Sequence, residues 1–284
     1  MKALAKIFIF LIFEFSVSVN AQEIVSVSFQ EQGVGKTFEA VLTKPKTAGN
    51  GKAVVILHHS GGWGAGTTKQ YADFLAGHGF TTLEPRMFNV HTVRAAPYLP
   101  QAFASLGYLG SLEGIDKNQV SVMGLSLGGM MSVFVASKWV NNEYNKTGLT
   151  FAKYAPFYPT CWLHAAVMNR KLPFMLSMAY KFDPAAMDVF VGKPMKIFAG
   201  DIDDNDDRDP DICHFMVSSM KDDVQKSMTE VVVYKNATHG WDQDSNNFMD
   251  RIVGCKGRGC RITLQSNPEV TRQALLDLLE FLNR

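Results

Sequence analysis

Beyond its N-terminal segment the sequence lacks a long apolar run, and it lacks an excess of charge of either sign. No stretch of about 18 apolar residues, the length that a membrane-spanning helix needs, follows residue 21. We therefore expect a soluble mature chain with no stable membrane insertion. A net charge of +1 over 284 residues provides no electrostatic attraction to nucleic acid. No internal repeat or linker divides the chain, which favours one domain over residues 22–284.

The first 21 residues have the pattern of a signal peptide. Lys2 and Lys6 precede an apolar run over residues 7–13, and Val19-Asn20-Ala21 fits a small-x-small cleavage site. Removing this segment takes away two lysines and one glutamate, so the net charge becomes 0. The sequence thus predicts an exported protein, periplasmic or secreted.

Cysteine is scarce, and all four cysteines follow the signal segment: Cys161, Cys213, Cys255 and Cys260. An even number in an exported chain predicts two disulfides. The short, glycine-rich stretch between Cys255 and Cys260 makes a local bridge easy, which leaves Cys161 to pair with Cys213. Reduced buried thiols are the alternative, and the spacing does not match the Cys-x-x-Cys pairs of a zinc site.

The remaining chain alternates strand and helix patterns, which predicts an α/β fold with a mostly parallel sheet covered on both faces. Residues 23–30 and 37–42 alternate as edge strands do, and 53–57, 80–83, 120–123, 151–154, 194–199 and 230–234 are the other expected strands. Helices are expected over 68–78, 97–109, 127–139 and 212–224. A last helix follows Pro268, with apolar residues four apart at Val270, Ala274, Leu278 and Leu282.

The most informative motif is Gly124-Leu-Ser126-Leu-Gly128, between a predicted strand and an apolar helix. This G-x-S-x-G pattern is typical of a nucleophile elbow, in which glycines two residues away on each side relieve crowding in a sharp turn. Ser126 is therefore the candidate nucleophile. The N–H of Leu127, at the start of the helix, is a candidate donor to an oxyanion.

A serine nucleophile needs a base and an acid, and the order Ser, Asp, His is that of α/β-hydrolases. We predict His239, after the last strand, as the base. The competing histidines are His58, His59, His78, His91, His164 and His214. Asp203 is the expected acid, because it lies three residues after Gly200 in the turn that follows a strand; Asp204 and Asp201 are the alternatives.

That turn opens a stretch with seven aspartates between Asp201 and Asp211. It begins like an EF-hand loop, but Asp206 stands where the sixth-position glycine belongs and Ile212 stands where the final glutamate belongs. We therefore expect a solvated acidic loop rather than a calcium site. No metal site is predicted.

The loop after residue 57 is expected to complete the site, because ligands of α/β sheets lie at the carboxyl ends of strands. A Ser60 N–H is the expected second oxyanion donor, and His59, Gly61, Trp63 and Trp241 are expected around the substrate, although either tryptophan could belong to the core. Residues 162–190, rich in methionine, are interpreted as a cap or lid over the site, with a membrane-docking surface as the alternative.

Together these motifs resemble the dienelactone hydrolase family over roughly residues 50–245. The resemblance is carried by residues 57–62, 71–75, 79–80, 122–129 and 157–161, by residues 200–204 with Cys213 behind them, and by the stretch from Tyr234 to Trp241 that contains His239. It implies an α/β-hydrolase fold and a nucleophile–His–Asp triad of Ser126, His239 and Asp203. The founding members of the family use cysteine at the nucleophile position and His-Gly where this chain has His58-His59.

The expected function is hydrolysis of carboxylic esters or lactones of small molecules through an acyl-enzyme, with no metal or organic cofactor. Amide or peptide hydrolysis by the same triad is one alternative. A non-catalytic binding protein on a hydrolase fold is the other.

Overall fold

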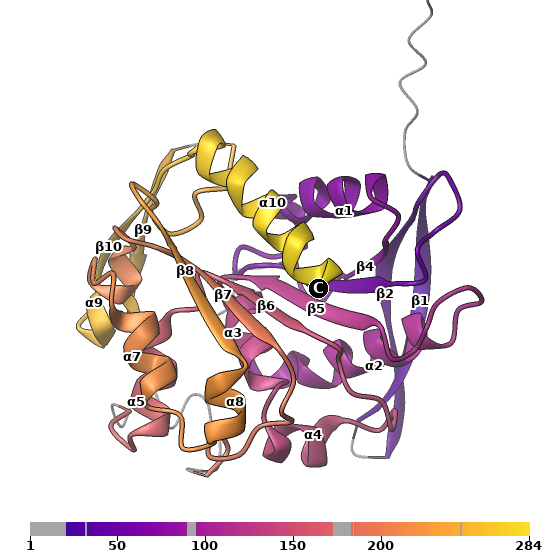
Figure 1. The fold of residues 1–284 in the computed structure, drawn as a ribbon, viewed down its shortest axis with the longest axis horizontal. Coiled ribbons are helices and arrows are strands. Elements are labelled where there is room, and N and C mark those ends of the chain that lie inside the picture. Colours follow the sequence, from indigo (N-terminus) through magenta and orange to yellow (C-terminus); the bar gives the residue numbers. More distant parts are fainter. Residues whose placement is uncertain (1–20, 32, 90–94, 173–182, 184, 245) are drawn as a thin grey trace, which may run out of the picture.

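Eight strands form one sheet in the order β1-β2-β4-β3-β5-β6-β7-β8 (Figure 1). The computed structural model describes residues 21–31, 33–89, 95–172, 183, 185–244 and 246–284. The strands are β1 Ala21–Glu31, β2 Val34–Lys44, β3 Ala53–Leu57, β4 Thr81–Pro85, β5 Val120–Leu125, β6 Tyr154–Phe157, β7 Met195–Gly200 and β8 Thr229–Tyr234. β2 pairs antiparallel with β1 and β4, and the other neighbours are parallel. The mostly parallel sheet predicted from the sequence is confirmed.

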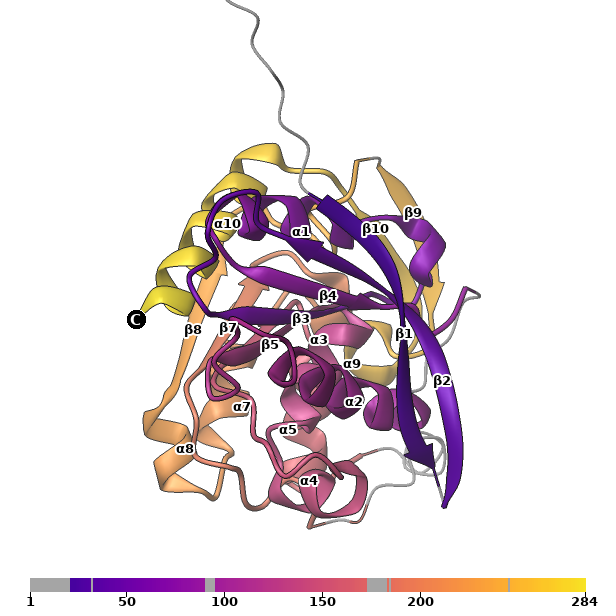
Figure 2. The same cartoon turned by 90° about the vertical axis from the view of Figure 1, so that its right-hand side faces the viewer.

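The middle of the sheet consists of strands that are buried on both faces. Every residue of β3, β4, β5 and β6 is buried. The continuous apolar run of β3, Ala-Val-Val-Ile-Leu, fits this position, since a central parallel strand has no face toward water. The outer strand β2 instead has a mixed pattern of exposed and buried residues, and the hairpin that it forms with β1 ends one side of the sheet (Figure 2).

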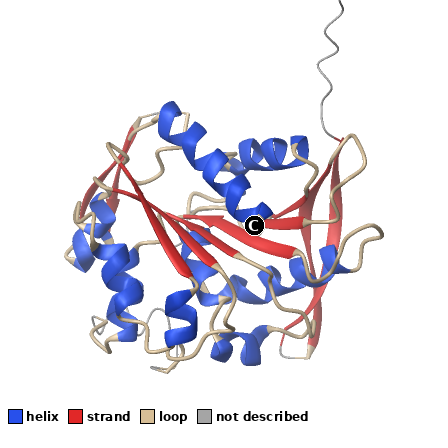
Figure 3. Cartoon of the chain, viewed as in Figure 1, coloured by secondary structure: helices blue, strands red, loops and turns tan. Residues whose placement is uncertain are grey.

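Helices cover both faces of the sheet, as Figure 3 shows. One face carries α1 Thr68–Gly77 and α10 Pro268–Asn283, and α10 buries Val270, Ala274, Leu278 and Leu282 there. The other face carries α2 Leu99–Gly110, α3 Leu127–Phe134, α4 Lys138–Tyr144, α5 Cys161–Met168 and α7 Ile212–Ser218. The described residues also form the short helices α8 Asp223–Ser227 and α9 Gly254–Gly257 and three 3₁₀ turns, η1 Trp63–Ala65, η2 Ala96–Tyr98 and η3 Asp204–Asp206.

Two of the expected helices are interrupted by capping residues. The helix expected over 127–139 ends at Phe134, because Ser137 is extended (ψ 136°) and caps a new helix, α4, by accepting a hydrogen bond from the Val140 N–H. The helix expected over 212–224 ends at Ser218, and Asp222 caps α8 in the same way. In both cases a side-chain oxygen caps the N-terminus of a new helix. The apolar periodicity continues through the capping residue, but the first helix does not.

Two strand expectations also differ from the structure. The strand expected over 151–154 lies at Tyr154–Phe157, where it pairs in parallel register with Val122–Leu125. A two-stranded hairpin, β9 Asn247–Arg251 with β10 Cys260–Leu264, was not expected at all. It lies at the end of the molecule where β7 and β8 finish (Figure 1).

The predicted signal segment, apart from Ala21, lies outside the described residues. The expected cap is described only in part: residues 162–168 belong to α5 and pack in the core beside α7, whereas 173–182 and 184 lie outside the description. Within the described residues, no helix combines the length and apolar character required to cross a membrane.

One buried acid lies on the sheet itself. Glu84 in β4 is 1 % exposed, and this burial raises the pKa of its carboxyl from 4.5 to about 7, with a hydrogen bond to Thr68 opposing the shift. Between these two pH values the folded chain retains a proton that the unfolded chain releases. Stability therefore falls as the pH rises from 4.5 to 7, and the full loss is present above 7.

Glu84→Gln should remove this loss. We expect the variant to match the wild type near pH 4 and to be more stable by about 3 kcal/mol above pH 7, since one pKa unit corresponds to about 1.4 kcal/mol. Urea unfolding at a series of pH values measures the difference. Glu113→Gln, at an exposed position, is the control, and a Glu84→Gln gain that does not change with pH would contradict the assignment.

Candidate active site

Ser126 occupies a strained turn between β5 and α3. Its backbone has φ 53° and ψ −109°, a left-handed φ that non-glycine residues rarely adopt, and its N–H donates to the Phe157 carbonyl at 3.0 Å. Its side chain is 6 % exposed. The surrounding structure thus holds the hydroxyl at the carboxyl end of β5, above the sheet edge.

The glycines of the motif allow three backbone segments to meet under this turn. A Cβ added at Gly124 would lie 2.2 Å from the Gly128 carbonyl, and one added at Gly128 would lie 2.1 Å from the Leu57 carbonyl oxygen at the end of β3. Neither glycine needs a left-handed φ. They are required because no side chain fits between the turn, α3 and β3.

A chain of two hydrogen bonds links Ser126, His239 and Asp203. The Ser126 Oγ lies 2.7 Å from His239 Nε2, and His239 Nδ1 lies 2.7 Å from Asp203 Oδ2. With the serine hydroxyl donating to Nε2, Nδ1–H donates to the carboxylate, which has only acceptors when ionised. His239 and Asp203 are each 2 % exposed. The structure therefore brings together the nucleophile, base and acid that the sequence nominates.

The two alternative acids make other contacts. Asp204 accepts from Arg208 Nε at 2.6 Å and from the Thr263 N–H of β10 at 2.8 Å. Asp201 accepts from the Ala237 N–H at 3.3 Å. Asp203 also accepts from the Asn205 N–H at 2.8 Å, which fixes its carboxylate in the turn after β7.

The two histidines that follow β3, His58 and His59, contact residues other than Ser126 and Asp203. His58 is buried, which lowers the pKa of its imidazole to about 4, and it packs edge to face on Phe88 with ring centroids 4.4 Å apart. His59 lies 3.1 Å from Thr67 Oγ1 through Nε2 and accepts from the Gly61 N–H at 2.9 Å through Nδ1. His59 thereby shapes the turn that contains Ser60.

A small pocket lies beside the hydroxyl of Ser126. It is lined by Ser60, Ser126, Leu127, Met130, Thr160, Asn205, Arg251 and Val253. Leu127 is the first residue of α3, so its N–H has no partner within the helix. Ser60, on the opposite loop, lines the same space, which places both nominated oxyanion loops at the pocket.

Four residues expected around the substrate are not among those that line this pocket. Trp241 is completely buried in the core cluster under α1 and α10, where it contacts Tyr158 and Tyr234 edge on. Trp63 is half-buried under the Arg86 guanidinium, 5.3 Å from its ring. His59 instead lines a separate polar pocket with Asp242. Gly61 lines neither that pocket nor the one beside Ser126. The sequence left Trp241 open between the pocket wall and the core, and its burial assigns it to the core.

Arg251 lines the pocket, although no pattern in the sequence predicted it there. It ends β9, and its guanidinium donates to the Ser60 hydroxyl. It is the one charged residue among the described residues that line the pocket. The alternation of Ile262 and Leu264 in β10 was a signal for the hairpin, but nothing local in the sequence points Arg251 toward Ser126.

The acidic loop is solvated only in its second half. Asp203, Asp204 and Asp206 are buried, whereas Asp207 and Asp211 are exposed. The expectation of a wholly solvated loop was therefore wrong. Each buried carboxylate has a specific partner: Asp203 has His239, Asp204 has the Thr263 N–H, and Asp206 has the first N–H groups of α5.

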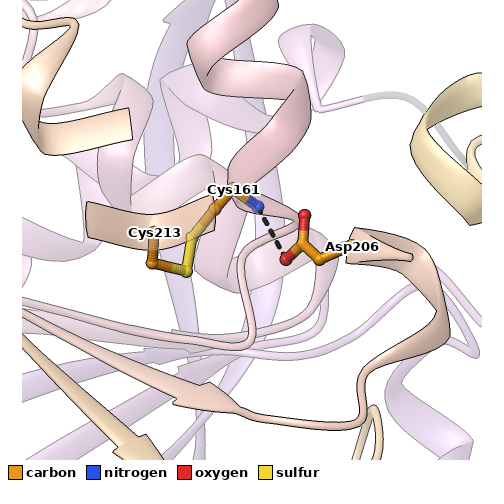
Figure 4. Close-up of side chains that lie close together, drawn as sticks. All are labelled: Cys161, Asp206 and Cys213. Atoms are coloured by element: carbon orange, nitrogen blue, oxygen red, sulfur yellow. Dashed lines mark hydrogen bonds between the residues drawn. A yellow bond between two sulfur atoms is a disulfide. The ribbon is translucent and has the colours of Figure 1, made fainter. Parts of the chain in front are cut away.

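Asp206 lies beside a disulfide at the start of α5 (Figure 4). Its carboxylate accepts from the Cys161 N–H at 3.0 Å and the Trp162 N–H at 2.8 Å, while burial and the neighbouring Asp203 raise its pKa. Cys161 is bonded to Cys213, and Cys255 to Cys260, as the sequence predicted. Although the Cys161, Cys213 and Asp206 ligand atoms are close, the disulfide leaves no thiolate to bind a metal.

A large, mostly parallel sheet with helices on both faces and a serine at a strand-to-helix turn defines the α/β-hydrolase fold, which this chain has. Among solved structures it is similar to a protein described as a dienelactone hydrolase from Klebsiella pneumoniae, with 16 % identity, a TM-score of 0.63, and 93 % of this chain and 100 % of that chain covered. A butyrate-bound esterase from Thermogutta terrifontis has 17 % identity and a TM-score of 0.61, with 88 % of each chain covered.

Est1E from Butyrivibrio proteoclasticus has 16 % identity and a TM-score of 0.55, covering 91 % of this chain and 99 % of that one. No protein-family model matches the sequence, and the search of curated proteins gives no match. At these identities the structural likeness establishes the fold.

The close approach at Gly128 leads to a stability prediction. Gly128→Ala should destabilise the chain by about 3 kcal/mol or more, because the new methyl group would meet the Leu57 carbonyl at 2.1 Å. Thermal unfolding measures this loss. Gly77→Ala, at the end of α1 where an added Cβ meets nothing within 4 Å, should be neutral or stabilising by up to about 1 kcal/mol; equal losses in both variants would contradict the steric account.

Proposed function

We propose that this chain is an exported serine hydrolase that cleaves carboxylic ester bonds, lactones included, in small molecules. The observation that carries the proposal is the pair of 2.7 Å hydrogen bonds from Ser126 to His239 and from His239 to Asp203, beside a pocket. An alcohol is a poor nucleophile at neutral pH, and an imidazole held by a carboxylate is the arrangement that activates it.

In the proposed reaction the Ser126 Oγ attacks the ester carbonyl while its proton passes to His239 Nε2. The Asp203 carboxylate stabilises the imidazolium that forms, through the bond at Nδ1. The negative charge on the carbonyl oxygen is stabilised by the Leu127 N–H, at the start of α3, and by a second N–H from the Ser60 turn. Donors of this kind contribute about 3–4 kcal/mol each in known hydrolases.

Collapse of this intermediate breaks the bond to the leaving alcohol, which takes the proton from His239. Water then attacks the acyl-enzyme by the same route, gives its proton to His239 and releases the acid. The Ser126 oxygen recovers its proton in the final step. These steps use protein side chains and water alone, and no metal or organic cofactor.

The choice of ester over amide substrates rests on the solved structures described above, which are named as esterases or as a dienelactone hydrolase. Export is supported by the pattern of residues 1–21 and by the two disulfides, which persist in oxidising compartments.

Ser126→Ala should abolish ester hydrolysis, lowering kcat/KM for a short-chain chromogenic ester by about 10³-fold or more. Ser132→Ala is the matched control, because Ser132 is a buried serine of α3 whose hydroxyl donates to the Gly128 carbonyl at 2.9 Å. We expect the control to stay within about threefold of wild type. A fluorophosphonate should label wild type and Ser132→Ala but not Ser126→Ala, and equal hydrolysis by all three would sink the proposal.

Asp203→Asn should lower kcat by about 10³- to 10⁴-fold while the fold persists, because the amide cannot hold the imidazole in the required tautomer. Asp204→Asn should reduce thermal stability, since Asp204 ties η3 to β10, and should change kcat by less than about fivefold. Steady-state kinetics and thermal unfolding of both variants separate the two roles. The reverse pattern would make Asp204 the acid.

A further inference from the structure

Another buried carboxylate, that of Asp242, lies three residues after His239. Asp242 is 3 % exposed, and two tyrosine hydroxyls donate to it: Tyr71 to Oδ2 at 2.6 Å and Tyr158 to Oδ1 at 2.7 Å. Both distances are those of well-formed hydroxyl hydrogen bonds. The three side chains come from α1, from the turn after β6 and from the turn after β8.

Tyr158 connects this carboxylate to the candidate base. Its ring stands edge on to the imidazole of His239, with centroids 4.9 Å apart and an interplanar angle of 67°. On another side it packs on Trp241 at 4.8 Å. Tyr158 is 1 % exposed and has φ 36°, a backbone strain that the surrounding structure must hold in place.

Burying Asp242 in this apolar cluster is costly. Desolvation raises the pKa of its carboxyl, and the hydrogen bonds from Tyr71 and Tyr158 act against that shift. Replacing such a polar group by apolar residues of similar volume is often neutral or stabilising. Stability alone therefore gives no reason for an acid here.

The loop that carries His239 is also anchored without the Asp242 carboxylate. The Trp241 carbonyl accepts from the Asn267 N–H at 2.7 Å, and the Asp242 carbonyl accepts from Gln70 Nε2 at 2.7 Å. These contacts hold the backbone. What the carboxylate adds is a fixed position for the Tyr158 hydroxyl, and so for the ring beside His239.

We propose that Asp242 is a positioning residue that acts through Tyr158, whose ring holds the imidazole of His239 in line with Ser126 and Asp203. This inference rests on the proposed hydrolase function. Misplacing a reacting group by about 1 Å can reduce a rate by about 100-fold, so a ring that limits tilting of the imidazole affects the chemical step and not substrate binding.

Tyr158→Phe and Tyr71→Phe provide the test, because each removes one hydroxyl bond to the same carboxylate but only the Tyr158 ring touches His239. We expect similar losses of thermal stability. Tyr158→Phe should lower kcat for the chromogenic ester about tenfold with KM within about twofold of wild type, whereas Tyr71→Phe should keep kcat within about twofold. Equal kcat values for the two variants would overturn the inference.

Asp242→Asn adds a second measurement, in which the residue keeps its shape and loses its charge. Its kcat should also fall with KM retained, and the Asp242→Asn/Tyr158→Phe double variant should be no slower than the slower single variant, because both changes act through one contact. Additive losses would overturn the inference. Ser126→Ala separates the two proposals. Full activity in that variant refutes Ser126 as the nucleophile and with it the proposed serine hydrolase, whereas Ser126-dependent hydrolysis with equal tyrosine variants refutes only the role of Asp242.

Discussion

The close approach of three backbone segments beneath Ser126 determines how the rest of the site is arranged. Gly124 and Gly128 permit β5, α3 and the end of β3 to come within distances at which a single added methyl group would clash. The turn that results pushes Ser126 to a left-handed φ and directs its hydroxyl away from the sheet. Because the other parallel strands end at the same edge, His239 in the turn after β8 reaches this hydroxyl, and Asp203 in the turn after β7 reaches His239.

The turn after β7 organises a second level of contacts. Within η3 and the residue before it, three carboxylates face three different elements: the imidazole after β8, the backbone of β10 and the N-terminus of α5. Asp203 is thereby followed in the chain by two anchored carboxylates, and the Cys161–Cys213 disulfide joins α5 to α7 next to them. The arrangement explains why an aspartate-rich loop is largely buried where it begins and exposed where it continues.

Local patterns were enough to predict most of the architecture. The continuous apolar run of β3, the strand–glycine–serine–helix transition at Ser126 and the spacing of four in α10 each arise from interactions within a few residues. Together they indicated the sheet, the elbow and the order of the nucleophile, acid and base. The two disulfide pairings followed from spacing and elimination.

What the sequence did not show depends on distant partners. The side chain of Arg251 reaches the pocket because the β9–β10 hairpin folds back on the Ser60 turn, which no local pattern encodes. The burial of Asp206 depends on the N–H groups of α5, and the position of Trp241 depends on α10 covering that face of the sheet. In each case the same residue in a different tertiary context would be exposed or would line the pocket.

The contacts at the site also span long stretches of chain. His239 and Asp203 are 36 residues apart, Ser126 and His239 are 113 apart, and Ser60 and Arg251 are 191 apart. Bringing such distant positions together requires the closure of large loops, whose entropic cost is offset only when the intervening sheet and both helical layers have assembled. A partly folded chain that has its helices and strands but lacks their final packing would therefore have no site at all.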